Sequence, residues 1–460
     1  MLIIPANSLA SGGFAVDNSC RFDGTSDYLN RTPSAGNRRT WTWSAWVKRS
    51  TLGGEQNLLA ADNNNRICFE TVDSADQFAL TDTNTSTIDV VTNQVFRDVS
   101  AWYHLVVAFD STQATASNRV KLYVNGTQVT SLARTTYPSL NAEFSINNNS
   151  AQYIGRNSGG SNYFNGYMAE TVFIDGSALT PTSFGEFDAD SGAWKAIDVS
   201  GLTFGTNGFY LDFEDSAALG DDVSGNSNDF TVNNLTAIDQ TTDTPTNNFA
   251  TWNRLIPPTF SNHNLIDGNL TVEGETSSQN TAFSTFAVSS GKWFCEMKLT
   301  VEGNATSTVP NFGIASTADF VHADSEAYFE TSGTNIYAGA VNNAQINRNG
   351  SDSGTNLSDT PDVGDIMGLA LDLDSGTNTL KFYLNGSLVG TVNINADEYC
   401  FITAVKEDDN KATVQGNFGG TNTYTVSSGN ADGNGYGNFE YTVPSGFLSL
   451  CTANLSEVLS

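Results

Sequence analysis

Two Asn-Gly turns in matching surroundings constrain the fold of this 460-residue chain more than any other feature. Residues 121–126 read KLYVNG and residues 381–386 read KFYLNG, and each follows an apolar segment, 105–110 (LVVAFD) or 369–374 (LALDLD). Asn-Gly is the strongest short signal for a β-hairpin, because a type I′ turn needs positive φ at both central positions. Each half is therefore predicted to contain strand, loop, strand, tight turn and strand. The separation of about 260 residues indicates two domains and not a repeat array.

Alternation of apolar and polar residues predicts β-strands wherever the sequence is regular. Residues 41–47 (WTWSAWV) are an example, because every second side chain is apolar and faces the same way. Charged residues make up only 15% of the chain, so Asn, Thr, Ser and Gly must cover much of the surface, and these favour turns and strand edges over helices. A single core stops growing at roughly 250 to 300 residues. We therefore predict an all-β fold of two tandem antiparallel β-sandwiches.

The most linker-like stretch is residues 239–258, which is polar and ends in a Pro-Pro pair that blocks regular strand pairing. It places the first sandwich at residues 1–238 and the second at residues 259–460. Residues 208–213 (GFYLDF) still have the pattern of a strand. The first sandwich is therefore expected to include a late strand segment at about 205–235.

The charge balance excludes some partners. The chain has 50 Asp and Glu against 20 Lys and Arg, a net charge of −30. Binding to a phosphate backbone relies on clustered Lys and Arg, so nucleic acid and anionic membrane surfaces are poor partners. No apolar run approaches the roughly 18 residues of a membrane span, and residues 1–13 lack the regions of a signal peptide. We expect a protein made in the cytoplasm, with no membrane insertion.

The five cysteines are odd in number, lie far apart and form no CxxC pair. This spacing favours buried free thiols over a zinc or redox site.

No residue pattern predicts a catalytic site, and we expect no enzymatic activity. Asp372 and Asp374 lie at alternate positions, as the paired carboxylates of glycoside hydrolases often do. The turn residues Gly376 and Asn378 follow them, so loop capping is the preferred interpretation. His104 lies in a predicted strand without a nucleophile partner, and a packed, hydrogen-bonded histidine is expected there.

Calcium is the one cofactor candidate. The loop of residues 221–229 (DDVSGNSND) is rich in the oxygen ligands that a hard cation prefers. The same composition is ordinary in the turns of an Asn-rich chain, so both interpretations stay open. The candidate calcium ligands are Asp221, Asp222, Asn226, Asn228 and Asp229.

Sugar recognition normally uses an exposed aromatic ring flanked by amides and carboxylates. The loop of residues 157–163 (NSGGSNY) offers this combination, and its candidate ligand-binding residues are Asn157, Asn162 and Tyr163. Trp46 is out of phase with the two tryptophans before it and is a second candidate ring. Both faces of a sheet can be covered in a sandwich, so we expect Trp46 to be packed.

Five segments of the first half resemble the laminin-G-like, or concanavalin A-like, jelly-roll family. They are residues 20–29, 41–48, 102–110, 122–126 and 164–170, which together span roughly residues 18–180. Residues 213–229 resemble the segment that normally opens such a domain. We hypothesise that this segment folds back to complete the first sandwich, as a circularly permuted element would.

The second half resembles the SPRY family of β-sandwiches over roughly residues 280–450. The segments that carry this resemblance are residues 291–297, 311–315, 364–374, 382–386, 417–420 and 444–447.

The pairing of the two domain types, with residues 31–41 (RTPSAGNRRTW) and 446–455 (GFLSLCTANL), resembles virion proteins of tailed bacteriophages. The resemblance implies a non-enzymatic fibre, spike or capsid decoration subunit at the virion surface. It also implies other virion structural proteins as partners, a homo-oligomer with a trimer as first guess, and host surface glycans as candidate ligands. Two other functions stay open: a virion-associated polysaccharide depolymerase on a jelly-roll scaffold, and a protein-binding adaptor that acts through the SPRY-like domain.

Overall fold

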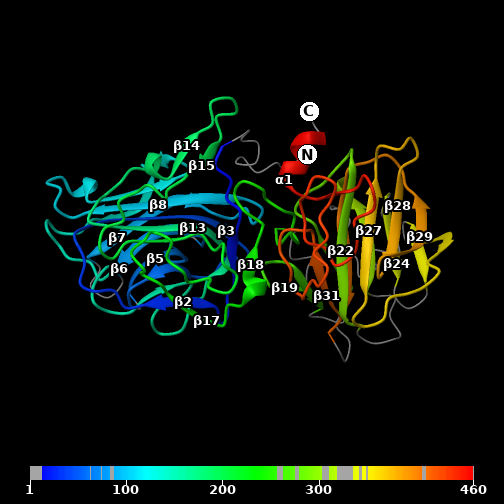
Figure 1. The fold of residues 1–460 in the computed structure, drawn as a ribbon, viewed down its shortest axis with the longest axis horizontal. Helices are drawn as coiled ribbons and strands as arrows, with labels where there is room; N and C mark the ends of the chain where they lie inside the picture. Colours follow the sequence, from blue (N-terminus) through cyan, green and yellow to red (C-terminus); the bar gives the residue numbers. More distant parts are fainter. Residues whose placement is uncertain are drawn as a thin grey trace. The chain divides into compact units, whose positions relative to one another are not determined.

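The computed structural model contains two compact units, Pro5–Asn247 and Asn248–Ser460, which we call the N-terminal and the C-terminal sandwich (Figure 1). The residues described are 13–62, 64–73, 75–82, 87–255, 263–274, 279–302, 310–318, 335–340, 344–348, 351–406 and 411–458. Both units are built from antiparallel sheets, so the prediction of an all-β fold of tandem β-sandwiches is confirmed.

The N-terminal sandwich consists of two layered sheets (Figure 1). Across the first sheet the strands are β10 (Thr127–Gln128), β9 (Val120–Val124), β8 (Trp102–Asp110), β3 (Thr40–Arg49), β13 (Asn165–Asp175), β1 (Ser19–Asp23) and β18 (Gln240–Thr241), with β16 (Phe209–Leu211) paired to β13. Across the second sheet they are β11 (Leu132–Thr136), β7 (Ile88–Val95), β6 (Gln77–Asp82), β5 (Asn65–Glu70), β4 (Gln56–Ala60), β12 (Gln152–Ile154), β2 (Tyr28–Arg31) and β17 (Thr231–Asn233). A separate hairpin is formed by β14 (Gly185–Phe187) and β15 (Trp194–Ala196).

Alternation along β3 separates two apolar clusters. Trp41 and Trp43 belong to the core between the sheets, where Trp41 stacks on Phe109 with ring centroids 4.9 Å apart. Trp46 points to the other face, as the period of two requires. It is 1% exposed and belongs to a separate outer cluster with Trp194 of β15. The expectation that Trp46 is packed is confirmed.

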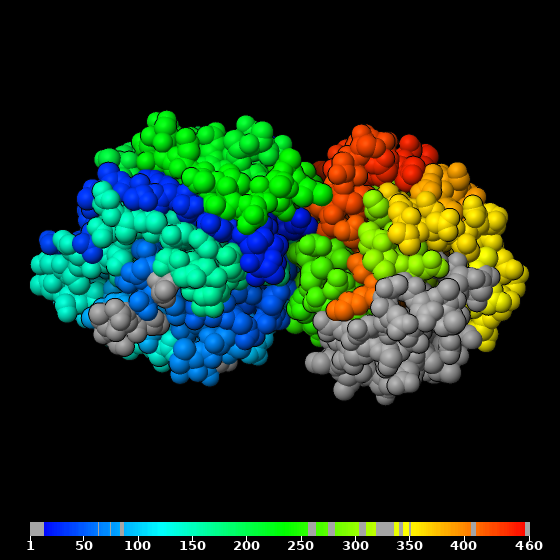
Figure 2. Space-filling view, turned by 90° about the horizontal axis from the view of Figure 1, so that it is seen from below, coloured from blue at the N-terminus to red at the C-terminus, as the bar shows by residue number. Residues whose placement is uncertain are grey.

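The late segment belongs to the N-terminal sandwich. Its strand β16 pairs with β13 and its strand β17 pairs with β2. Phe209 and Phe230 are buried in the core between the sheets. Figure 2 shows the chain after residue 200, in green, lying against the dark blue N-terminal strands.

The described part of the predicted linker is not a free linker. Asp239 forms an ion pair with Arg21 at 2.7 Å, and β18 continues the first sheet beside β1. Trp252 is fully buried in the core of the C-terminal sandwich. The division falls between Asn247 and Asn248, because residues on either side of it are drawn into separate cores. The Pro-Pro pair at 257–258 lies outside the described residues.

The C-terminal sandwich also has two sheets. The strands of one are β19 (His263–Ile266), β20 (Thr271–Gly274), β31 (Thr413–Asn417), β22 (Lys292–Val301), β27 (Ile366–Asp372), β28 (Thr379–Leu384) and β29 (Ser387–Asn393), with β32 (Leu448–Ser449) paired to β22. Those of the other are β21 (Gln279–Phe283), β30 (Tyr399–Lys406), β23 (Asn311–Ser316), β24 (Ile336–Ala340), β25 (Gln345–Arg348) and β26 (Ser351–Asn356).

Helical structure in the described residues is confined to short pieces. These are α1 (Thr452–Val458) and the 3₁₀ turns η1 (Ala116–Asn118), η2 (Pro181–Ser183) and η3 (Ala237–Asp239). No helix in the described part of the chain is long and apolar enough to cross a membrane. All five cysteines are buried free thiols, as predicted.

The twin Asn-Gly turns have the same geometry in both sandwiches. The φ angles are 45° and 78° at Asn125 and Gly126, and 46° and 78° at Asn385 and Gly386. Positive φ at both positions is the type I′ pattern, so the predicted hairpins are confirmed. Each turn asparagine also binds the start of the preceding strand. The Asn125 carboxamide oxygen accepts the His104 backbone N–H at 2.8 Å, and the Asn385 oxygen accepts that of Ile366 at 3.0 Å.

The first hairpin turn tests this packing. A Cβ atom at Gly126 would lie 2.2 Å from the Trp194 ring, whereas Gly53, with a similar φ of 79°, has open space around it. We expect Gly53→Ala to lower the free energy of unfolding by about 1 kcal/mol through backbone strain alone. Gly126→Ala should cost about 2 to 4 kcal/mol, because overpacking adds to the strain. Denaturant unfolding of the N-terminal sandwich measures both, and equal losses would contradict the packing against Trp194.

Candidate functional site

Four partly exposed side chains form a group on the outer face of the second sheet of the N-terminal sandwich. We call this group the tyrosine–arginine surface, and its members are Tyr28, Tyr153, Arg156 and Tyr163. Tyr28 lies on β2 and Tyr153 on the antiparallel neighbour β12. The next residues, Leu29 and Ile154, are fully buried in the core. Because strand side chains alternate between faces, the two tyrosines must point outward.

Arg156 lies among the three rings. Its guanidinium carbon is 3.5 Å from the centroid of the Tyr28 ring, 4.9 Å from that of Tyr153 and 5.9 Å from that of Tyr163. Its Nη1 donates a hydrogen bond of 3.3 Å to the Tyr163 hydroxyl. A guanidinium stacked on aromatic rings is held in one orientation, and it still presents several N–H donors.

The loop predicted from the sequence supplies one member of this surface. Tyr163 belongs to it, and Asn162 lies next to it, with its amide nitrogen donating to Glu55 Oε1 at 2.5 Å. Asn157 is only 4% exposed. Its amide group closes the loop, because its oxygen accepts the Ser161 N–H at 3.0 Å and its nitrogen donates to Ser161 Oγ at 2.9 Å. Asn157 therefore positions the loop and presents no free group to a ligand.

The charge of Arg156 is unusual in this chain because no carboxylate pairs with it among the described residues. Other arginines on the same sheet are paired: Arg66 contacts Glu55 at 3.0 Å, and Arg134 contacts Asp89 at 2.6 Å. With 50 acidic residues against 20 basic ones, an arginine without an acidic partner is a donor group available to a ligand.

Sequence reasoning missed Tyr28, Tyr153 and Arg156. The alternation in residues 28–31 and 152–154 shows which side chains point outward. It does not show that β2 and β12 are neighbours, because their partners lie more than 100 residues apart in sequence. An exposed tyrosine on each of two strands becomes a surface only when the strands pair.

The candidate calcium loop is closed by its own hydrogen bonds. Asp222 Oδ1 accepts the N–H groups of Tyr210 and Ser224, and its Oδ2 accepts that of Asn228 at 2.8 Å. Asp229 Oδ1 accepts the Asp222 N–H at 3.0 Å, while the amide nitrogens of Asn226 and Asn228 donate to backbone carbonyls. In the part of the chain that the structure describes, no group of three acidic, histidine or cysteine side chains could hold a metal ion. Calcium at Asp221 and its neighbours stays a prediction from the sequence.

The turn carboxylates act as predicted. Asp372 Oδ1 accepts the N–H groups of Asp374 and Ser375 at 3.1 and 3.0 Å, so it caps the loop after β27. Asp374 Oδ1 accepts the Gly291 N–H at 2.8 Å. The preferred interpretation of this pair as loop caps is confirmed.

His104 is packed and hydrogen-bonded, as predicted. Its Nε2 lies 2.8 Å from Ser44 Oγ, and its Nδ1 accepts the Trp194 indole N–H at 3.0 Å. Burial lowers the pKa of His104 to about 3, so the ring is neutral at physiological pH. His263 has no described side chain, and His322 lies outside the described residues.

Two buried glutamates fix neighbouring segments. Glu170 sits in the bulge of β13 with a positive φ of 48° and accepts the Tyr210 hydroxyl at 2.7 Å. Glu296 of β22 accepts the backbone N–H groups of Glu440 and Tyr441. Burial raises the pKa of Glu170 to about 8 and that of Glu296 to about 7, although these hydrogen bonds act in the opposite direction. Their hydrogen bonds give both groups a structural task.

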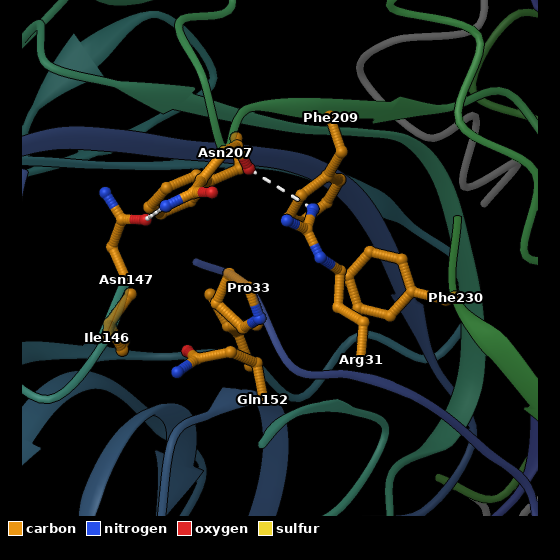
Figure 3. A pocket seen from close by; sticks show the side chains of 10 residues that line it. Arg31, Pro33, Ile146, Asn147, Gln152, Asn207, Phe209 and Phe230 are labelled. Carbon is orange, nitrogen blue, oxygen red and sulfur yellow. Dashed lines mark hydrogen bonds between the residues drawn. The ribbon is translucent and has the colours of Figure 1, made fainter. Parts of the chain in front are cut away.

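A small cavity lies between the sheets of the N-terminal sandwich (Figure 3). Its volume is about 20 Å³, which suffices for about one water molecule and not for a sugar. Arg31 and Asn207 lie at its edge, where Arg31 Nη1 donates to the Asn207 carbonyl at 3.2 Å and the Asn207 amide donates to Asn147 Oδ1 at 3.0 Å. This cavity is a packing defect bridged by polar groups and offers no substrate pocket.

Comparison with known proteins supports the fold assignment of the first half. Residues 23–184 match the family described as the Concanavalin A-like lectin/glucanases superfamily (Laminin_G_3). The match covers most of the N-terminal sandwich and ends before the late segment. A search of curated proteins finds no match.

Solved structures with similar folds include three with informative titles. The SPRY domain of human HERC1 is 13% identical, with 36% of this chain and 95% of that chain covered and a TM-score of 0.29. A putative carbohydrate binding protein from Bacteroides ovatus is 14% identical, with 48% and 59% covered and a TM-score of 0.34. Domain 4 of AbnA, a GH43 extracellular arabinanase from Geobacillus stearothermophilus solved in complex with arabinotriose, is 20% identical, with 36% and 73% covered and a TM-score of 0.28.

The buried carboxyl group of Glu170 makes stability depend on pH. Its folded pKa of about 8 lies above its ordinary value of 4.5, so between these pH values the unfolded chain ionises while the folded chain keeps the proton. The free energy of unfolding therefore falls as pH rises from about 4.5 to about 8. We expect Glu170→Gln to raise the melting temperature of the N-terminal sandwich at pH 8 and to leave it nearly unchanged at pH 4.5.

The control for this measurement is Glu186→Gln, since Glu186 is exposed and pairs with Lys195 at 3.3 Å. This variant should change the melting temperature little at either pH. A Glu170→Gln variant that is destabilised equally at both pH values would show that the folded protein needs the carboxylate form.

Proposed function

We propose that this chain is a non-enzymatic glycan-binding protein whose N-terminal sandwich binds sugar through the tyrosine–arginine surface. The observation that carries the proposal is the unpaired guanidinium of Arg156, held between outward-facing tyrosine rings at 3.5 and 4.9 Å. The match of residues 23–184 to a superfamily of lectins and glucanases supports the same function class.

The chemistry of the surface suits a sugar ring. Tyrosine rings are flat and carry negative charge density on their faces, so they attract the C–H groups on one side of a sugar. Their hydroxyl groups supply polar edges, and Arg156 has N–H donors beyond the one that binds Tyr163. Such donors bind hydroxyl or carboxylate oxygens of a glycan, and the carboxylate offers the charge that Arg156 lacks.

The non-enzymatic part of the proposal is supported by the roles of the acidic groups. Retaining and inverting glycosidases both need two carboxyl groups that face the scissile bond. Asp372 and Asp374 cap a loop instead, and Glu170 is hydrogen-bonded to Tyr210 in a buried bulge. The rival function, polysaccharide depolymerisation, predicts release of reducing ends or unsaturated products from capsular or algal polysaccharides.

A glycan array with the full chain tests binding. For any glycan bound by the unaltered protein, we expect Arg156→Met to weaken affinity at least tenfold, about 1.4 kcal/mol. Tyr153→Ala should weaken it similarly, because a packing ring is lost. The matched control is Arg39→Met, which removes an exposed arginine of the same sandwich that pairs with Glu143. Unchanged affinity in Arg156→Met, or equal loss in Arg39→Met, would contradict the proposed site.

For the biological setting we propose the surface of a bacteriophage particle, where the protein acts as a homo-oligomeric fibre, spike or decoration subunit beside other virion proteins. The support is the resemblance of residues 31–41 and 446–455 to such proteins. Antibody labelling of purified particles in the electron microscope should mark the particle surface. A particle proteome without the chain would contradict this setting.

A further inference from the structure

A polar groove of about 190 Å³ lies on the outer face of the first sheet of the N-terminal sandwich. Its floor is formed by Ala108 of β8 and by Lys121 and Tyr123 of β9, and one wall by Leu179 in the segment after β13. Asp110 and Asn118 lie at its other side. The tyrosine–arginine surface belongs to the second sheet, so the two sites are separate.

The groove is built into the fold. Ala108 stands opposite Lys121 in the pairing of β8 with β9, and its small side chain leaves the space that a larger residue would fill. Fully buried Thr42 of β3 fastens the wall, because its Oγ1 accepts the Leu179 N–H at 2.7 Å and donates to the Ser177 carbonyl at 2.7 Å. Floor and wall are therefore held to the same sheet, and the groove is preformed.

Two polar groups in the groove have no protein partner in the described structure. Tyr123 is 8% exposed, and its hydroxyl makes no hydrogen bond with any described residue. A nearly buried hydroxyl without a partner costs roughly 1 to 3 kcal/mol unless a ligand or water satisfies it. Burial raises the pKa of Tyr123, so the hydroxyl keeps its proton and can donate.

Lys121 is the second such group. Its side chain is partly buried and makes no ion pair with a described carboxylate, although Asp110 lines the same groove. Asp110 is oriented by its own turn, since its Oδ1 accepts the N–H and hydroxyl groups of Thr112 at 3.0 and 2.6 Å. The groove thus offers a cation, a fixed carboxylate and a buried hydroxyl that do not satisfy one another.

We propose that this groove binds a single acidic sugar residue of the hexuronate type. The sugar carboxylate pairs with Lys121, and its hydroxyls accept from Tyr123 and donate to Asp110. The volume is below the roughly 300 Å³ of sites for drug-sized ligands and suits one sugar ring. The site does not depend on the tyrosine–arginine surface, because no residue is common to both.

Titration calorimetry of the full chain with sodium glucuronate tests the proposal, with glucose and sodium acetate as comparison ligands. Glucuronate should bind at least tenfold more tightly than either, because only it offers both a carboxylate and ring hydroxyls. Equal binding of glucose would overturn the role of Lys121, and equal binding of acetate would overturn sugar recognition. Absence of glucuronate binding would overturn the proposal entirely.

Variants locate the binding. Lys121→Met should weaken glucuronate binding at least tenfold, Lys121→Arg should retain most of it, and Tyr123→Phe should weaken it about fivefold. Melting temperatures close to that of the unaltered chain would show that these variants fold. Arg156→Met serves as the matched control and should leave glucuronate binding unchanged. A loss in Arg156→Met without a loss in Lys121→Met would place the sugar on the tyrosine–arginine surface and overturn the groove.

Discussion

The N-terminal sandwich depends on a buried ion pair between Lys48 and Asp243. The two groups are 2.6 Å apart and each side chain is 1% exposed. Asp243 also accepts the Trp102 indole N–H at 3.1 Å, so one carboxylate joins the end of the unit to strands β3 and β8. Charges so far from water are tolerated only when they are paired, and removal of one partner typically costs about 3 to 5 kcal/mol. Arg21 and Asp239 repeat the arrangement at 2.7 Å beside β1. Together these pairs bind residues 239–243 to the first sheet and close the sandwich.

The same need for partners makes the candidate sites recognisable. In a chain with a net charge of −30, acidic groups are plentiful, and most arginines and lysines of the N-terminal sandwich are paired or bonded to backbone carbonyls. Arg156 and Lys121 differ, because the one is surrounded by tyrosine rings and the other faces a groove without an ion pair. Both lie on outer faces, one on each sheet. The rigid core between the sheets holds these faces in place while only side chains and loops form the contacts.

The two sandwiches share a local solution to the same problem. In each, the asparagine of an Asn-Gly turn binds the backbone of the strand before it, and an aromatic ring lies over the glycine. The ring is Trp194 in the N-terminal sandwich and Tyr441 in the C-terminal one. A glycine under a ring leaves room for close approach, which explains why this dipeptide stands at both hairpins. The similarity is one of local geometry, since the strand orders of the two units differ.

The sequence by itself determined the strands, the twin type I′ hairpins, the burial of Trp46, the neutral packed His104 and the capping role of Asp372, because each follows from side-chain period or from residues close together in sequence. It also indicated Tyr163 as part of a binding surface. Only the tertiary structure decided which residues join it. Tyr28 and Tyr153 meet through a pairing of β2 with β12 that spans more than 100 residues, and Leu179 faces Lys121 only because Thr42 holds the intervening segment. The predicted linker failed for the same reason: a polar segment looks free until the buried lysine that binds its aspartate is in place. Pairing between distant strands, and the partners it supplies to buried charges, is not written in local sequence patterns.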